Sequence, residues 1–189
     1  PVWKSVPIGL LDKTGRSVLF CYRIADLVNR KLELMEFKGS RALVTGASSG
    51  MGEVFARELA RRGADLVLAA RSRDKLEVLA SELRESGHVS VHVEAVDLSE
   101  PGAGLAPAAR LGEHDLAIDV LVNNAGFGLF GPLDEADAER IAQAVQLNVA
   151  ALTELTCALL PGMRARDRGA IVNVASTAAF QPVPYMAVY

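Results

Sequence analysis

A glycine-rich segment contains residues whose types and spacing could bind a phosphate group. It reads Thr45-Gly46-Ala47-Ser48-Ser49-Gly50-Met51-Gly52 and lies between a short apolar run and a helical pattern. Gly46 permits a tight turn, Gly50 lets the backbone approach a pyrophosphate, and Gly52 allows a helix to pack closely on a strand. Free N–H groups at the helix N-terminus then hold the anion. The segment predicts a dinucleotide site, and the alternative is a purely structural turn.

The residue that follows the second predicted strand indicates which dinucleotide binds. A site for NAD(H) places Asp or Glu about 20 residues past the glycines, where it binds the ribose 2′-hydroxyl. Here Ala70 takes that place and Arg71 follows it. A carboxylate would repel a 2′-phosphate, whereas a guanidinium group binds it through paired hydrogen bonds. Arg71 therefore favours NADP(H), and the alternative is that Arg71, like Arg73, is a solvated surface residue.

In these features the sequence resembles the short-chain dehydrogenase/reductase family, whose fingerprint is Thr-Gly-x-x-x-Gly-x-Gly. The match is complete at the threonine and the three glycines, and the family motif Asn-Asn-Ala-Gly is present at 123–126. Asp97 and Leu98 stand at the family position that contacts the adenine. The resemblance covers residues 36–189 and implies a bound NADP(H). The cofactor-binding residues it implies are Gly46, Ser48, Ser49, Gly50, Met51, Gly52, Arg71, Asp97, Leu98, Asn124, Ala125 and Gly126.

The resemblance also implies a catalytic serine and tyrosine. Ser176 follows the last predicted strand, and Tyr189 lies thirteen residues later, which is the usual separation in the family. Tyr185, nine residues after Ser176, fits less well and is expected to line the substrate loop. Reduction of a carbonyl needs a proton donor for the developing alkoxide and a hydrogen bond that holds the oxygen. By the resemblance, Tyr189 is the acid or base and Ser176 holds the oxygen.

Asn148 is the third residue for which the resemblance implies a catalytic role. It lies within an apolar helical run, where its side chain competes for backbone hydrogen bonds. In the family this asparagine interrupts the helix, and its main chain holds a water molecule that extends a proton relay. The alternative is a buried amide that is satisfied by its neighbours.

The tyrosine needs a cation nearby, because its ordinary pKa of about 10 is too high for a base near neutral pH. In the family this cation is the lysine of a Tyr-x-x-x-Lys motif, and the sequence ends at Tyr189. We expect the lysine, the last strands and helices and most of the substrate loop to be missing. On this expectation the stretch is inactive when it is expressed alone.

Apolar strand-like runs alternate with helical patterns from Arg41 onward, as in βαβ units. This order predicts an incomplete, Rossmann-like, doubly wound α/β fold with a parallel sheet. We expect an N-terminal extension at 1–38 and an NADP-binding domain at 39–189. Either Met35 is the true start, or residues 1–34 form an extra helix that includes the amphipathic stretch 16–34. The expected strands are 41–45, 65–70, 89–96, 119–122 and 170–175, and the main helices are 53–62, 72–87 and 134–166.

The composition narrows the possible partners. A net charge of −3 and a pI near 5.7 give no sign of a nucleic-acid-binding face. Cys21 and Cys157 lie far apart and lack the spacing of a metal site. No uninterrupted apolar run approaches the ~20 residues of a membrane span. We therefore expect a cytoplasmic protein with no bound metal, whose partner is a small carbonyl or alcohol.

Two further regions of the sequence are expected to form a substrate pocket and a subunit interface. The segment Phe127-Gly128-Leu129-Phe130 and the loop at 180–186 are expected to line an apolar substrate pocket. The helix at 149–163 commonly forms a subunit interface in the resembling family, so the parent protein is expected to be a homo-oligomer. The alternatives are a noncatalytic NADP-binding regulatory domain, an S-adenosylmethionine methyltransferase and a structural or oligomerisation module.

Overall fold

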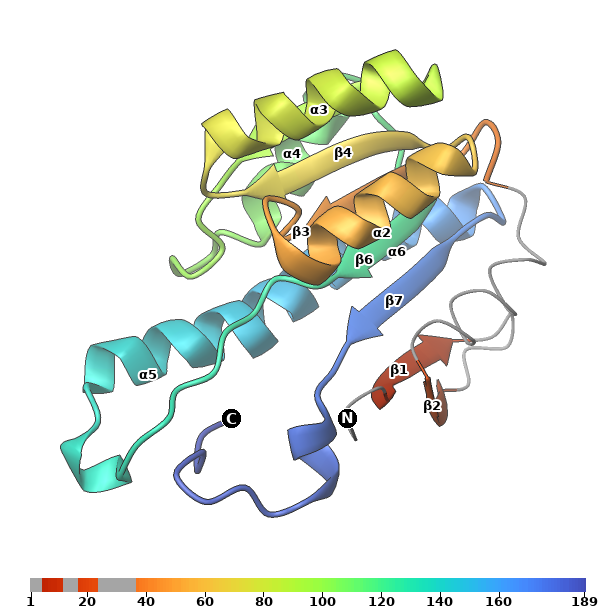
Figure 1. The fold of residues 1–189 in the computed structure, drawn as a ribbon. Helices are drawn as coiled ribbons and strands as arrows, with labels where there is room; N and C mark the ends of the chain where they lie inside the picture. Colours follow the sequence, from red (N-terminus) through yellow and green to blue (C-terminus); the bar gives the residue numbers. More distant parts are fainter. Residues whose placement is uncertain (1–4, 12–16, 24–36) are drawn as a thin grey trace.

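The computed structural model of the chain describes residues 5–11, 17–23 and 37–189 (Figure 1). Within them, one sheet has the strand order β2-β1-β7-β6-β3-β4-β5. Five of these strands run parallel and form the doubly wound sheet that the sequence predicts. When they are numbered by their place in the chain, their order across the sheet is 3-2-1-4-5. Their bounds are Arg41–Thr45 for β3, Asp65–Ala70 for β4, Val91–Ala95 for β5, Val120–Asn123 for β6 and Ala170–Val174 for β7.

Helices cover both faces of this parallel sheet (Figure 1). Helices α2 (Gly50–Arg61) and α3 (Arg73–Gly87) pack on one face, and α4 (Leu105–Glu113) and α6 (Leu152–Ala165) contribute to the core on the other. Successive residues of a strand point to opposite faces. The strands are therefore buried on both sides, which is why the sequence shows them as continuous apolar runs.

Strand β3 illustrates this division of the core. Ala42 and Val44 belong to the core under α2 and α3, whereas Leu43 lies in the second core with Leu111 of α4 and Leu155 of α6. All three β3 side chains are fully buried. The strand that leads into the glycine-rich segment is thus fixed from both faces.

The buried stripe of α2 differs from the one that the sequence suggests. The helical spacing of Val54, Phe55 and Leu59 predicts that they form the apolar stripe of this helix; Leu59 is buried and Phe55 packs against the core, but Val54 is 65% exposed. The residues that face the sheet are Gly52, Ala56, Leu59 and Ala60. Small side chains at a spacing of four let this helix approach the sheet closely. This close packing places the larger apolar side chain of Val54 on the solvent side.

The long helix expected at 134–166 has the predicted extent but contains a change of pitch. A short 3-10 turn at Leu133–Glu135 comes first, and α5 (Ala138–Val145) then begins at Asp137, whose carboxylate accepts a hydrogen bond from the Glu139 N–H. Residues Gln146–Ala151 form a π-helical segment before α6 continues the same helix. Such a segment in a helix often marks a functional site.

The continuous helical segment Ala138–Ala165 is long and apolar enough to cross a membrane by length and composition. It has 28 residues, and its most apolar stretch of 18 residues has a mean hydropathy of 1.3 and is 17% buried. Polar and charged residues interrupt this segment, so a search for uninterrupted apolar runs in the sequence does not find it. Within the structure the helix buries Leu155 and Met163 in the core beside the sheet.

The N-terminal extension contains two strands in the part that the structure describes. Strands β1 (Ser5–Leu11) and β2 (Ser17–Arg23) pair antiparallel, and β1 also pairs antiparallel with β7. The expected extra helix is therefore wrong for residues 5–11 and 17–23, and the other residues of 1–34 lie outside the described residues. Strand β1 lies between β2 and β7, so that the β7 edge of the parallel strands is paired.

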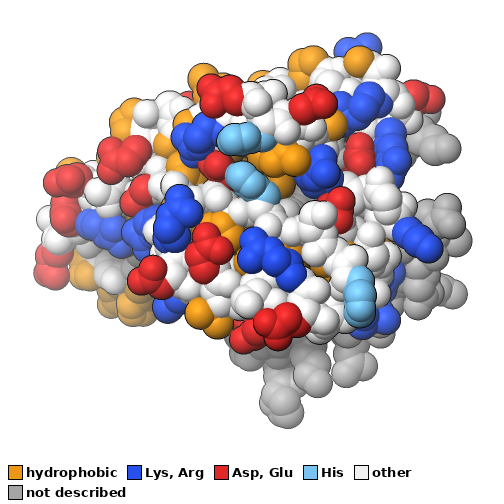
Figure 2. Space-filling view, turned by 90° about the horizontal axis from the view of Figure 1, so that it is seen from above, with side chains coloured by type: hydrophobic (Ala, Val, Ile, Leu, Met, Phe, Trp, Pro, Cys, Tyr) orange, Lys and Arg blue, Asp and Glu red, His pale blue; other side chains and the backbone are white. Residues whose placement is uncertain are grey.

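Basic and acidic side chains alternate over one face of the molecule (Figure 2). On α2, Glu58 accepts hydrogen bonds from both Arg61 and Arg62 at 2.6–2.8 Å. The hydrogen bonds from Arg61 contribute most, and together with Arg62 they outweigh partial burial and lower the pKa of Glu58 to about 2. The Glu58 side chain is only 24% exposed, so that the pair is partly protected from solvent.

This pair predicts a contribution to stability that depends on pH. Because the pKa of Glu58 is lower in the folded chain, its contribution is present above the ordinary value of 4.5 and is lost as the pH falls through about 2. We expect Glu58→Gln to lower the unfolding free energy by about 1 kcal/mol at pH 6 and by less at pH 3. Urea denaturation at both pH values measures this, and Glu113→Gln on the exposed side of α4 is the control. Equal losses at the two pH values would contradict the assignment.

Candidate functional site

The glycine-rich segment forms the predicted turn between β3 and α2. Gly46 and Gly50 have φ values of +67° and +60°, which side chains other than glycine adopt with strain. A Cβ atom at Gly52 would lie 2.2 Å from the carbonyl oxygen of Gly46 and 2.6 Å from the Asn124 amide nitrogen. The roles expected of Gly46 in the turn and of Gly52 in close packing are therefore confirmed by the geometry.

The N-terminus of α2 suits an anion. The residue that precedes the helix, Ser49, makes no capping hydrogen bond with its side chain. A Cβ atom at Gly50 would meet no atom within 4 Å, so the space above the turn is open. The first N–H groups of the helix, which have no side-chain cap, and the positive end of the helix dipole lie at this turn. These features fit the pyrophosphate of a dinucleotide.

Thr45 and Asn124 join the glycine turn to the loop that follows β6. The Thr45 hydroxyl donates to the Val122 carbonyl at 3.2 Å and accepts from the N–H groups of Asn124 and Ala125 at 3.0 Å each. The Asn124 side-chain amide donates to the Thr45 carbonyl at 2.9 Å. These bonds use the hydroxyl's single donor and both of its acceptor positions. Two segments far apart in the sequence are thereby fixed side by side.

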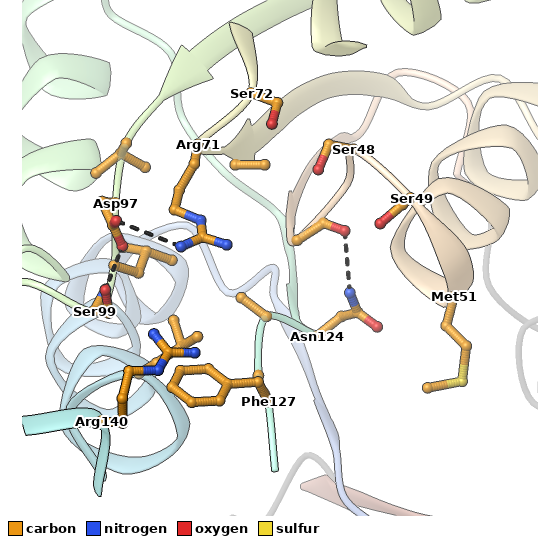
Figure 3. A pocket seen from close by; sticks show the side chains of 17 residues that line it. Ser48, Ser49, Met51, Arg71, Ser72, Asp97, Ser99, Asn124, Phe127 and Arg140 are labelled. Carbon is orange, nitrogen blue, oxygen red and sulfur yellow. Dashed lines mark hydrogen bonds and ion pairs between the residues drawn. The ribbon is translucent and has the colours of Figure 1, made fainter. Parts of the chain in front are cut away.

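A cavity of about 420 Å³ lies over the carboxyl ends of these strands (Figure 3). It brings together ten of the twelve predicted cofactor-binding residues, while Gly50 and Gly52 are not part of its lining. The predicted residues that line it are Gly46, Ser48, Ser49, Met51, Arg71, Asp97, Leu98, Asn124, Ala125 and Gly126. One cavity therefore contains the glycine turn, the residue after β4 and the asparagine motif.

Seven residues of this lining are not among the predicted cofactor-binding residues, namely Ala70, Ser72, Val96, Ser99, Phe127, Arg140 and Leu147. Ser72 and Ser99 lie next to predicted residues, and Ser99 two positions after Asp97 is a turn pattern that could have been noticed. Arg140 and Leu147 come from the long helix, where a spacing of seven places them on one face. No local motif marks these two residues, because only the packing of the helix brings them to the cavity.

The charged groups of the cavity include an ion pair. Arg71 Nη1 lies 3.8 Å from Asp97 Oδ2, and Asp97 Oδ1 accepts hydrogen bonds from the Ser99 hydroxyl at 2.6 Å and N–H at 2.9 Å. Burial by itself would raise the pKa of Asp97, but the bonds from Ser99 and the charge of Arg71 lower it below its ordinary value. Asp97 is thus an acceptor held in place, and Arg71 projects from the end of β4 with its side chain 71% exposed.

Asn148 lies in the π-helical segment, which confirms that the helix is interrupted there. Its side chain accepts from the Phe127 N–H at 3.1 Å and donates to the Phe127 carbonyl at 2.8 Å. The alternative of a satisfied amide therefore holds for the side chain. The two bonds fix the backbone of the residue that follows the Asn-Asn-Ala-Gly motif.

The structure brings two of the three predicted catalytic residues to one small cavity. Tyr189 and Asn148 both line a cavity of about 80 Å³, together with Phe127 and Leu129. Ser176 is not part of that lining, and its hydroxyl accepts a hydrogen bond from the Ala178 N–H at 3.2 Å. Tyr189 is 46% exposed. The geometry shown thus joins Tyr189 to the asparagine but not to the serine.

The predicted apolar pocket is formed only in part. Phe127 and Leu129 line the small cavity, whereas Phe130 is exposed and its ring packs against Tyr185 at 5.6 Å between centroids. The Gly131 N–H donates to the Tyr185 carbonyl at 2.9 Å. The loops after β6 and β7 are therefore joined to each other at the border of the site.

The parallel sheet, the glycine turn and the cavity at the carboxyl edge define a dinucleotide-binding α/β chain. Residues 40–189 match the sequence profile of the family described as short chain dehydrogenase. The chain belongs to this family, and its relatives are oxidoreductases that act on carbonyl substrates with NAD(P)H.

Individual relatives agree with this membership. The human very-long-chain 3-oxoacyl-CoA reductase is 36% identical over 155 residues, which are 80% of this chain and 49% of the relative. A short-chain dehydrogenase from Sphingobium yanoikuyae in complex with NADPH is 41% identical, with a TM-score of 0.74 over 79% of this chain and 58% of the other. L-Sorbose reductase from Gluconobacter frateurii, complexed with NADPH and L-sorbose, is 39% identical, with a TM-score of 0.76 over 82% and 60%. The chain spans about half the length of the curated relatives it matches.

The close approach at Gly52 leads to a test of the turn. In Gly52→Ala the new Cβ would press on backbone, so we expect the unfolding free energy to fall by about 2 kcal/mol and NADPH affinity to fall at least about tenfold. Thermal unfolding and NADPH fluorescence titration measure the two effects. Gly112→Ala is the control, because a Cβ atom there meets no atom within 4 Å, so stability should hold or rise. Unchanged NADPH binding in Gly52→Ala would show that the turn is not at the nucleotide.

Proposed function

We propose that this chain is the cofactor-binding part of an NADP(H)-dependent oxidoreductase that interconverts a carbonyl and an alcohol. The observation that carries the proposal is the single cavity that joins the uncapped N-terminus of α2 to Arg71. A helix N-terminus binds pyrophosphate, and a guanidinium group binds a 2′-phosphate. The NADPH named in the complexes of two relatives supports the same cofactor.

Separate groups of residues in this chain bind the cofactor and act on the substrate. The glycine turn and α2 hold the pyrophosphate, Arg71 holds the 2′-phosphate, and Asp97 with Leu98 borders the adenine. When bound, NADP(H) supplies or accepts the hydride. Tyr189 donates the proton to the substrate oxygen in reduction and removes it in oxidation, and Ser176 holds that oxygen.

Asn148 serves this chemistry by position. Its side chain forms hydrogen bonds with the backbone of Phe127, so that its main chain remains for the proton relay that the family resemblance implies. Phe127 lines both the 420 Å³ cavity and the 80 Å³ cavity that contains Tyr189. By holding Phe127, Asn148 fixes the wall shared by the cofactor and the tyrosine.

The cofactor preference is tested at Arg71. We expect Arg71→Gln to weaken NADPH binding at least about tenfold, because a charge-assisted phosphate contact is lost, and to change NADH binding less than about twofold. Fluorescence titration with both nucleotides gives the two dissociation constants. Arg73→Gln is the matched control, since Arg73 pairs with Glu77 on α3 and does not line the cavity. Equal losses for NADPH and NADH in Arg71→Gln would refute the 2′-phosphate contact.

The catalytic role is tested at Tyr189, in a protein that continues through the lysine of the family motif. We expect Tyr189→Phe to lower turnover of a carbonyl panel at least about 100-fold, because the proton donor is lost, with NADPH affinity unchanged. Tyr185→Phe removes the other candidate hydroxyl and should retain turnover. Tight NADPH binding with no turnover in the unaltered protein would instead support the noncatalytic regulatory domain.

A further inference from the structure

Arg140 lies in the cofactor cavity although it comes from the first turn of α5, far in sequence from the nucleotide motifs. Its guanidinium carbon lies 4.6 Å from the centroid of the Phe127 ring, and its Nη1 donates to Gln143 Oε1 at 2.7 Å. Figure 3 shows the Arg140 side chain beside the Phe127 ring, on the same side of the cavity as Asp97 and Ser99. The glycine turn with Ser48 and Ser49 lies on the other side.

The charges of the cavity lining make Arg140 necessary for a net positive site. Its charged residues are Arg71, Asp97 and Arg140. Asp97 faces Arg71 at 3.8 Å and offsets its charge. Among the residues that the structure describes, no carboxylate forms an ion pair with Arg140. Arg140 therefore gives the cavity lining its net positive charge.

The guanidinium group is positioned before any ligand binds. Stacking on Phe127 occupies one face of the group, and the bond to Gln143 uses one of its five N–H donors. The backbone of Phe127 is itself held by two hydrogen bonds with the Asn148 side chain, one accepted and one donated by Asn148. A planar group held on one face loses little further entropy when its other donors take a phosphate.

We propose that Arg140 is a second ligand of the cofactor's 2′-phosphate, approaching it from α5 while Arg71 approaches from the end of β4. This rests on the proposed function, because it assumes that NADP(H) occupies the cavity. The pyrophosphate has the backbone N–H groups of α2 on the far side of the cavity, so the phosphate at the Asp97 side is the one that Arg140 serves. Arg140 is thus a specificity-determining residue that the nucleotide motifs do not mark.

Titrations with NADPH and NADH test this, because the two nucleotides differ only in the 2′-phosphate. We expect Arg140→Gln to weaken NADPH binding at least about fivefold and to change NADH binding less than about twofold. Arg140→Lys retains the charge but not the planar fork, so its NADPH affinity should lie between those of the unaltered chain and Arg140→Gln. Arg164→Gln on α6, which makes the same charge change outside the cavity, should bind both nucleotides as the unaltered chain does.

A double variant separates a shared phosphate from two independent effects. If Arg71 and Arg140 bind the same group, the loss in Arg71→Gln/Arg140→Gln should differ from the product of the two single losses. Unchanged NADPH affinity in Arg140→Gln, or an equal loss for NADH, would overturn the assignment of Arg140 and leave the proposed function intact. Failure of the unaltered chain to bind NADPH would overturn the proposed function and this assignment together.

Discussion

The side-chain hydroxyl of Thr45 joins the two strands whose following loops make the nucleotide cavity. It lies at the end of β3, is 2% exposed, and bonds to the backbone of β6 and of the loop after it. Because all three of its hydrogen-bonding positions are used inside the protein, the loop at 124–126 has one position relative to the glycine turn. The Asn124 amide then packs where Gly52 leaves room for it. The shape of the cavity follows from this contact.

A second fixed point lies one residue beyond the asparagine motif. Asn148 lies in the π-helical segment, and its side chain holds both the N–H and the carbonyl of Phe127. Phe127 separates the larger cavity from the smaller one next to Tyr189 and supports the guanidinium group of Arg140. One amide side chain therefore connects the cofactor side of the site to the proposed catalytic tyrosine.

The electrostatics of the cavity are set by few groups. An Asp97 carboxylate that is held by Ser99 and faces Arg71 is well suited to accept a hydrogen bond, but it also reduces the attraction that Arg71 offers an anion. A cofactor with a 2′-phosphate adds negative charge at this end of the cavity. A second arginine from a different element resolves this conflict without removal of the carboxylate.

The sequence by itself determined the parallel sheet, the glycine turn and most of the residues that line the larger cavity, because each depends on local features. Strands β3 and β4 are buried on both faces and read as apolar runs, and the turn needs glycine at positions with positive φ such as Gly46. Only the tertiary structure decided that Val54 faces solvent and that residues 17–23 form a strand that pairs with β1. It also decided that Arg140 and Leu147 reach the cavity. These outcomes depend on which surfaces of separate elements pack together, and a local pattern of side chains carries no information about the element that lies opposite.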